Sequence, residues 1–348
     1  MTYFEKSLKA QIKKDAIILA IESSCDETAC AVIKGGRQIL SNEILSSVSK
    51  HIPFGGVVPE IASRAHTSAI SITVDRAIKN AKISLSDIDA IAVTYGAGLL
   101  GALLVGVSYA KALAFSLNIP LIPVSHIRGH LSASYLNNEN LEPPFISVLC
   151  SGGHTAIIEV KDYYTYNVLR KKLDDAVGVA FDKVAWVLGL EYPGGPYIEK
   201  LALSGSNTVE LPKMPMSKFG YDFSYSGLKT AVINTVNTLK MKGQEVNKAD
   251  IACSFQETAI DMIVTRAIKA VKESGYKTLT VGGGVGANGR LRQKLEKECK
   301  NLNINLVLPE KVLCTDNACM IGAEGYLQYL KGNFANLDLN ASANVNLQ

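Results

Sequence analysis

The stretch Ile17-Ile-Leu-Ala-Ile-Glu-Ser-Ser-Cys-Asp-Glu-Thr-Ala-Cys-Ala-Val-Ile33 places a polar turn between two apolar runs. Short apolar runs on either side of a polar segment are typical of two strands joined by a turn. The pattern recurs at residues 145–160, where Ser151-Gly-Gly-His-Thr155 separates two further apolar runs. The repetition predicts two structurally duplicated lobes, each beginning with a strand–turn–strand unit.

Alternating strand and helix patterns follow each of these units. In the first half we predict a helix over 65–81, a strand over 90–94, a helix over 99–117 and a strand over 121–124. In the second half we predict helices over 249–274, 289–300 and 316–330, and strands over 278–281 and 304–308. The segment 205–223 is rich in Pro, Gly, Ser and Met and is predicted to be a long irregular loop. Strands that alternate with helices indicate an α/β fold with mixed sheets.

The composition excludes several classes of protein. A chain of 348 residues with 47% hydrophobic residues buries a sizeable core, which excludes a disordered, collagen-like or disulfide-stapled protein. The net charge of +4 is too small to indicate nucleic-acid binding by itself. Seven cysteines, an odd number in a long chain, indicate reduced thiols and therefore a cytoplasmic protein. Residues 1–15 lack an apolar signal core and are expected to form a loose basic extension.

Residues 90–110 contain no charged side chain and are long enough to span a membrane. Glycines interrupt the segment at 96, 98 and 101, and the helical pattern continues past Lys111. We therefore interpret it as a strand, a glycine-rich turn and a core helix, and we expect no association with a membrane.

The spacing of His126 and His130 indicates a metal site. If the segment between them is helical, both imidazoles lie on one face and can share an ion, with stacking or capping roles as the alternatives. A zinc protease would need Glu where this chain has Ile127. Asp316 is a candidate third ligand, although Asp is also a common helix N-cap. Two histidines and a carboxylate suit Fe(II), with Zn(II) as the competitor.

The glycine-rich segment 281–292 formally matches a dinucleotide-binding fingerprint at Gly284, Gly286 and Gly289. It begins too close to the end of the sequence for the remaining strands of that fold to follow. The weaker interpretation is that its glycines allow close approach of the backbone to adenosine or phosphate.

Asp26 and Glu27 lie in the first polar turn among hydroxyl side chains. They are candidates for holding a substrate ammonium or hydroxyl group, or for accepting a proton. The alternative is an ordinary polar turn.

Together these segments resemble the TsaD family of bacterial tRNA threonylcarbamoyladenosine transferases. The motifs that carry the resemblance are Ile21-Glu-Ser-Ser-Cys-Asp-Glu-Thr28, Phe54-Gly-Gly-Val-Val-Pro-Glu-Ile-Ala-Ser-Arg-Ala-His66, His126-x-x-x-His130, Ser151-Gly-Gly-His-Thr155, Ala180-Phe-Asp-Lys183, Tyr192-Pro-Gly-Gly-Pro196, Phe223-Ser-Tyr-Ser-Gly-Leu-Lys229 and Cys314-Thr-Asp-Asn317. The resemblance covers residues 16–335 in order.

The resemblance implies an actin-like, sugar-kinase-like ATPase fold with two lobes and a central cleft. Residues 16–124 and 311–348 would form the first lobe and residues 125–310 the second. It further implies transfer of a threonylcarbamoyl group from threonylcarbamoyl-AMP to N6 of adenosine 37, in tRNAs that read codons beginning with A. The implied metal ligands are His126, His130 and Asp316. The implied substrate contacts, with an adenine nucleotide in the cleft, are Leu149, Cys150, Ser151, Gly152, Gly153, Asp182, Gly195 and Asn288.

The family acts with partners, namely tRNA, a TsaB-like paralogous scaffold, a TsaE-like ATPase and a TsaC-type enzyme that makes the adenylate. Asp26 and Glu27 are our candidates for proton removal or threonyl positioning. This chain has Arg128 where many members have Glu, and Val179 where a Glu is frequent. The rival hypotheses are a phosphotransferase of the carbohydrate-kinase type, which does not need the histidine pair, and a non-catalytic scaffold paralogue, which would lack the metal ligands.

Overall fold

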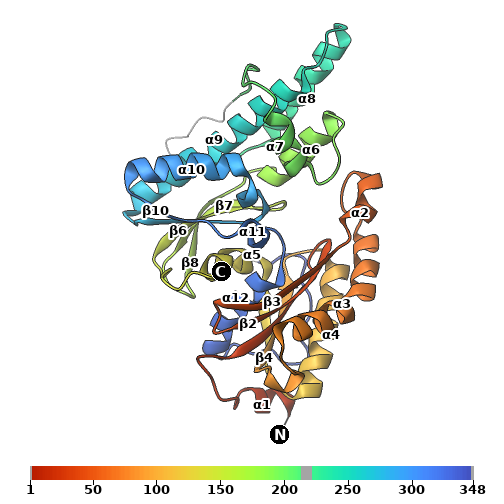
Figure 1. Ribbon diagram of the computed structural model, residues 1–348, viewed down its shortest axis with the longest axis vertical. Coiled ribbons are helices and arrows are strands. Elements are labelled where there is room, and N and C mark those ends of the chain that lie inside the picture. Colours follow the sequence, from red (N-terminus) through yellow and green to blue (C-terminus); the bar gives the residue numbers. More distant parts are fainter. Residues whose placement is uncertain (1, 213–221, 346–348) are drawn as a thin grey trace. The chain divides into compact units, whose positions relative to one another are not determined.

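The computed structural model describes residues 2–212 and 222–345 (Figure 1). They form two compact units, Met1–Leu141 with Asp316–Gln348, and Glu142–Thr315. These boundaries differ from the predicted ones at 124/125 and 310/311. Residues 125–141 belong to the first unit because the helix α5 (His126–Ser132) packs against α12 (Ala318–Leu330). Residues 311–315 belong to the second unit because α11 (Lys311–Cys314) packs against the turn Gly284–Ala287.

The first unit contains a five-stranded sheet in the order β3-β2-β1-β4-β5. Its strands are β1 (Ile17–Glu22), β2 (Glu27–Lys34), β3 (Gln38–Ser46), β4 (Ala90–Gly96) and β5 (Leu121–Ser125). β1 pairs antiparallel with β2 and parallel with β4, and β4 pairs parallel with β5. The predicted strand–turn–strand unit is thus confirmed, with β3 as an additional edge strand.

Side chains of β1 alternate between two helical layers, as the two-residue period of a strand requires. Leu19 and Ile21 pack into a core with α3 (Pro59–Ala81) and α4 (Leu100–Leu117). Ala20 and Ile18 face the other way and lie against Gly322 and Gly325 of α12. Helices therefore cover both faces of the sheet, which explains why β1 is apolar throughout.

The helix α4 is long and apolar enough to cross a membrane by length and composition, and it is the one such helix in the described part of the chain. Its residues Val107, Ala110 and Ala114 belong to the core of the first unit, and the helix packs against α3 and β4. This packing supports the interpretation as a core helix.

The N-terminal extension is docked rather than loose, which corrects the expectation from the sequence. Thr2 and Glu5 form a capping box that begins α1 (Tyr3–Ser7). The Tyr3 hydroxyl donates to the Ile119 carbonyl over 2.7 Å, and the Tyr329 hydroxyl donates to the Gln11 carbonyl over 2.9 Å. These bonds satisfy the phenol groups and hold the extension on the first unit.

The second unit repeats the architecture, with a sheet in the order β10-β9-β6-β7-β8. Its strands are β6 (Phe145–Cys150), β7 (Thr155–Val160), β8 (Tyr166–Lys171), β9 (Thr278–Gly282) and β10 (Asn305–Val307). β6 pairs antiparallel with β7 and parallel with β9, and β9 pairs parallel with β10. Because order and direction match those of the first sheet, the predicted duplication is confirmed.

Helices supply most of the remaining core of the second unit. They are α6 (Val177–Val187), α7 (Gly194–Ala202), α8 (Ser226–Met241), α9 (Lys248–Ser274) and α10 (Gly289–Leu302). Phe181 of α6 meets Phe255 of α9 edge to face, with ring centroids 5.0 Å apart. Of the loop predicted over 205–223, residues 213–221 lie outside the described residues.

Candidate metal centre and nucleotide cavity

The helix α5 begins at His126, directly after β5, and carries both histidines on one face. Their rings lie edge to face, with centroids 4.6 Å apart. His126 is 8% exposed and His130 is 1% exposed. The spacing of four residues therefore places both imidazoles in one pocket, as the helical interpretation predicts.

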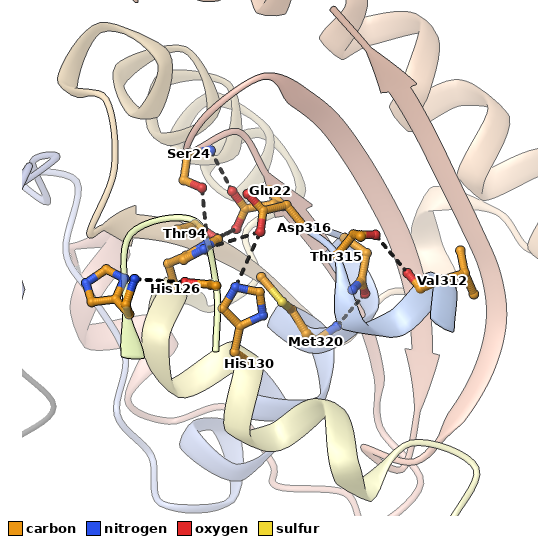
Figure 2. A network of polar contacts seen from close by, with 12 residues as sticks. Glu22, Ser24, Thr94, His126, His130, Val312, Thr315, Asp316 and Met320 are labelled. Carbon is orange, nitrogen blue, oxygen red and sulfur yellow. Dashed lines mark hydrogen bonds and ion pairs between the residues drawn. The ribbon is translucent and has the colours of Figure 1, made fainter. Parts of the chain in front are cut away.

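Asp316 meets both imidazoles from the segment that precedes α12. Its Oδ1 lies 3.5 Å from Nε2 of His126 and 3.3 Å from Nε2 of His130 (Figure 2). The alternative role of Asp316 as helix N-cap falls instead to Asn317, whose side chain accepts a hydrogen bond from the Met320 amide. Two segments that are 186 residues apart in sequence are thus brought together at one point.

The donor set fits a divalent metal. The ligand atoms of His126, His130 and Asp316 lie within 4.8 Å of one another. Among the described residues, neither ring nitrogen of the buried His130 has a hydrogen bond of normal geometry. Such an unsatisfied imidazole is costly in a protein interior unless an ion or ligand engages it. Two nitrogens and one carboxylate oxygen leave coordination positions open, as in Fe(II) and catalytic Zn(II) sites.

The surroundings shift the pKa values of the two histidines in opposite directions. Burial disfavours an imidazolium, but the carboxylates of Asp316 and Glu22 outweigh it and raise the pKa of His126 to about 9. Burial lowers the pKa of His130, and the neighbouring His126 acts in the same direction. Glu22 was not among the predicted site residues, although it lies in the motif that contains Asp26 and Glu27.

The first polar turn holds Asp26 and Glu27 at the start of β2. Asp26 is 7% exposed, and its carbonyl accepts hydrogen bonds from the Ser47 hydroxyl and amide. The Glu27 carboxyl accepts from the Ser46 hydroxyl over 3.0 Å. Burial, together with the adjacent Asp26, raises the pKa of Glu27 to about 10. Burial thus favours the protonated form of Glu27, which suits a hydrogen-bond donor better than a base.

The second unit contains a cavity of about 280 Å³ above the carboxyl end of β6. Glycine backbones, two carboxylates and aromatic rings form its wall. The lining residues are Gly152, Gly178, Phe181, Asp182, Tyr192, Pro193, Gly195, Pro196, Glu199, Gly284, Val285, Ala287, Asn288 and Thr315. Its volume is near the lower end of the range for small-molecule sites, about 300 Å³.

The predicted substrate contacts divide into two groups. Gly152, Asp182, Gly195 and Asn288 line the cavity. Leu149 and Cys150 are buried in β6, whereas Ser151 and Gly153 lie in the β6–β7 turn and are not among the lining residues. Half of the predicted set therefore lines the cavity, and the other half flanks the lining residue Gly152 in the sequence.

Two glycines allow neighbouring segments to pack closely against the end of β6 and the β6–β7 turn. A Cβ on Gly178 would lie 2.7 Å from the Ser151 carbonyl oxygen. A Cβ on Gly283 would lie 2.4 Å from the Cys150 carbonyl oxygen, and the φ of Gly283 is +88°. A larger residue at either position would displace the turn or strain the backbone. The glycine-rich segment thus lies against the cavity, as its close-approach interpretation predicts.

Two carboxylates hold the helix ends at this cavity. Asp182 Oδ1 accepts from the Gly194 amide over 2.8 Å, at the start of α7. Glu199 Oε1 accepts from the Gly289 amide over 2.9 Å, at the start of α10. Asn288 caps α10 and donates to Gln256 Oε1 over 2.9 Å. Sequence reasoning missed Glu199 and Gly178, although Glu199 lies three residues after the Pro-Gly-Gly-Pro motif.

Solved structures resemble this fold. Full-length HypF in its phosphate- and nucleotide-bound form matches with a TM-score of 0.61 and 16% identity, over 92% of this chain and 56% of that chain. Component A of (R)-2-hydroxyglutaryl-CoA dehydratase from Acidaminococcus fermentans matches with a TM-score of 0.51 and 16% identity, over 91% of this chain and 99% of that chain. The duplicated sheets and these likenesses define a protein of the actin-like ATPase fold, here with a candidate metal centre in its first unit.

Sequence comparison identifies the family. The family model described as TsaD, tRNA N6-adenosine threonylcarbamoyltransferase, matches residues 38–323. The protein of that name from Clostridioides difficile (strain 630) is 51% identical over 96% of this chain and 99% of its own length. The protein of that name from Clostridium perfringens (strain SM101 / Type A) is 50% identical over 95% of this chain and 98% of its own length. The chain therefore belongs to the TsaD family and is a transferase, not a carbohydrate kinase.

Proposed function

We propose that this protein transfers the threonylcarbamoyl group from threonylcarbamoyl-AMP to N6 of adenosine 37 in tRNAs that read codons beginning with A. Family membership over nearly the whole chain supports the reaction class. The convergence of His126, His130 and Asp316 supports an active enzyme over a scaffold paralogue. This constellation carries the proposal, because a scaffold has no use for two buried imidazoles that face one carboxylate.

The reaction is an acyl transfer to a weak amine nucleophile. A bond forms between N6 and the carbamoyl carbon, the bond from that carbon to the phosphate oxygen breaks, and AMP departs. N6 loses one proton in the process. The protein must hold N6 about 3 Å from the carbamoyl carbon and stabilise the developing charge on its oxygen.

His126, His130 and Asp316 would hold the metal, with Fe(II) favoured and Zn(II) as the competitor. A bound divalent ion supplies Lewis acidity and a template for oxygen ligands. Two protein nitrogens and one carboxylate leave room for substrate oxygens at such an ion. The buried surroundings of the two histidines limit competition from water for these positions.

The cavity of the second unit would bind the adenine nucleotide portion of the substrate. The carboxylates of Asp182 and Glu199 suit the hydroxyl donors of a ribose. The backbones at Gly152, Gly195 and Gly284 allow close approach of phosphate or base. Leu149, Cys150, Ser151 and Gly153 would position this wall from β6 and its turn.

Asp26 is our candidate for proton removal from N6 or for positioning the threonyl group, whose hydroxyl and carbamoyl N–H can donate hydrogen bonds to a carboxylate. Glu27, with its pKa raised to about 10 by burial and by Asp26, would position Asp26 or the threonyl group as a hydrogen-bond donor. The two neighbouring carboxyl groups would thus have different roles.

We place the protein in the cytoplasm, acting on tRNA together with a TsaB-like scaffold and a TsaE-like ATPase. A TsaC-type enzyme would supply threonylcarbamoyl-AMP. The partner assignments rest on the family resemblance, and the net charge of +4 agrees with an enzyme that shares RNA binding with other subunits.

The test is a reconstituted assay of tRNA modification. Purified protein, threonylcarbamoyl-AMP and unmodified tRNA are incubated with and without the partner proteins, and the modified nucleoside is measured by mass spectrometry. We expect modified adenosine with the partners present and none with the Asp316→Asn variant. Absence of modified adenosine under both conditions, from protein shown to be folded and metal-loaded, would overturn the proposal.

A further inference from the structure

We propose that Glu22 is a positioning residue that fixes the orientation and the tautomer of His126 for metal binding. The inference rests on the proposed metal centre and extends it to a carboxylate outside the set of three ligands. Oε2 of Glu22 lies 3.1 Å from Nδ1 of His126 (Figure 2). Nε2 of the same ring points the other way, toward Asp316.

Glu22 is a fully buried carboxylate at the end of the central strand β1. The Thr94 hydroxyl of β4 donates to Oε2 over 2.6 Å, and the Ser24 amide donates to Oε1 over 2.5 Å. The Ser24 amide can only donate, so Oε1 is an acceptor, and Oε2 accepts from the Thr94 hydroxyl. A carboxylate in a protein interior requires such hydrogen-bond donors.

The geometry selects one tautomer of His126. Nδ1 faces two oxygens, Oε2 of Glu22 and, at 3.0 Å, Oγ of Ser24. Both oxygens of Glu22 accept hydrogen bonds from Ser24 and Thr94, so a bare nitrogen at Nδ1 would place its lone pair against a lone pair of Oε2. A proton on Nδ1 removes this conflict and leaves the lone pair of a neutral ring on Nε2, where the metal would bind.

A carboxylate that accepts from the remote nitrogen of a metal-binding histidine has a known physical effect. It fixes the ring and raises the basicity of the ligating nitrogen, and its loss weakens metal binding by about 10- to 100-fold. Glu22 meets the requirements of this role. It is buried, it faces Nδ1 of His126 as an acceptor, and the Thr94 hydroxyl on β4 holds it in place by a hydrogen bond. His130 has no equivalent carboxylate at its Nδ1 within the described residues, so the effect is specific to His126.

The experiment measures Zn(II) binding by the purified protein in competition with a chelator, independently of tRNA modification. Glu22→Gln keeps the shape and one acceptor oxygen but removes the charge. The matched control is Glu159→Gln in the second unit, where Glu159 accepts from Asn167 and from the Tyr276 hydroxyl. We expect Zn(II) affinity to fall about 10- to 100-fold in Glu22→Gln and to stay unchanged in Glu159→Gln.

A second measurement needs no variant and covers the case in which Glu22→Gln does not fold. In the Zn(II)-loaded protein labelled with ¹⁵N-histidine, NMR should show a proton on Nδ1 of His126 and none on Nε2. The proposal is overturned if Nδ1 proves to be the metal-bound nitrogen, or if folded Glu22→Gln binds Zn(II) as tightly as the unaltered protein. Because neither readout involves transfer, failure of the proposed function would leave both results interpretable.

Discussion

Nε of Arg128 lies 2.9 Å from Oε1 of Glu324, whose side chain is 1% exposed. Ser132 donates to the other carboxylate oxygen over 2.7 Å. Arg128 and Ser132 lie on α5 with the two histidines, whereas Glu324 lies on α12, which follows Asp316. One buried carboxylate thus joins the helix α5 to the helix α12, which follows the candidate ligand Asp316, and Arg128 has an acidic partner in this chain.

Removal of Arg128 should therefore destabilise the protein. Arg128→Ala leaves Glu324 buried without its cation, and we expect the free energy of unfolding to fall by about 3 kcal/mol. The double variant Arg128→Leu/Glu324→Leu should recover most of this loss, since an apolar pair of similar volume replaces two buried charges. Urea denaturation of the single and double variants measures the coupling. Additive losses would show that the two residues do not interact.

The raised pKa of Glu27 predicts a dependence of stability on pH. In the unfolded chain Glu27 loses its proton near its ordinary pKa of 4.5, whereas in the folded protein it keeps the proton up to about pH 10. Between these values the folded state binds more protons, so this residue lowers stability as the pH rises, by at most about 1.4 kcal/mol per pH unit.

Glu27→Gln removes that dependence. The variant should gain stability relative to the unaltered protein as the pH is raised from 5 to 9, in unfolding experiments at each pH. Glu60→Gln is the control, because Glu60 is exposed and paired with Arg64 on the surface of α3. A difference between Glu27→Gln and the unaltered protein that stays constant with pH would rule out a protonated Glu27.

The two carboxyl groups of the first turn should differ in their effect on transfer. Asp26→Asn is expected to lower kcat by about 10²- to 10⁴-fold, the usual contribution of a proton acceptor. Glu27→Gln should have a much smaller effect near pH 7, since the amide retains a hydrogen-bond donor. Both variants should keep their bound metal. Single-turnover transfer from threonylcarbamoyl-AMP measures the effect, and full activity of Asp26→Asn would refute its role.

A side chain at position 178 should impair the nucleotide cavity. Gly178→Ala places a Cβ 2.7 Å from the Ser151 carbonyl oxygen, so the β6–β7 turn must shift. We expect weaker binding of AMP by isothermal titration calorimetry and a loss of about 1–3 kcal/mol in stability from overpacking. Gly227→Ala is the control, since a Cβ at Gly227 would meet no atom within 4 Å among the described residues. Equal AMP affinity in both variants would show that AMP does not bind in this cavity.

The sequence predicted those parts of the fold that depend on local pattern. The two apolar–polar–apolar segments became β1–β2 and β6–β7, and α4, α9, α10 and α12 appeared near their predicted ends. The helix α3 begins six residues before its predicted start, and α6, α7 and α8 were not predicted. β3 and β8 were not predicted, because Gln38–Ser46 and Tyr166–Lys171 mix polar and apolar residues at sheet edges. There, pairing with a neighbouring strand decides the structure rather than the pattern of the segment itself.

The candidate site was predictable only in part from spacing. His126 and His130 share a helix, so their period places them together. Asp316 joins them through tertiary structure, and the family resemblance was needed to select it. Glu22 and Glu324 could not be identified in advance, because a glutamate in a strand or helix gives no sign in sequence that it will be buried against a histidine or an arginine.

The central claim is that His126, His130 and Asp316 hold a metal on which transfer to tRNA depends. The most direct measurement compares His130→Ala with His51→Gln for metal content by mass spectrometry and for formation of the modified nucleoside. His51 is equally buried, but its ring nitrogens engage the Ser47 hydroxyl and the Val58 amide. We predict that His130→Ala loses both metal and transfer while His51→Gln keeps both. A folded His130→Ala variant that modifies tRNA at the unaltered rate would contradict the account.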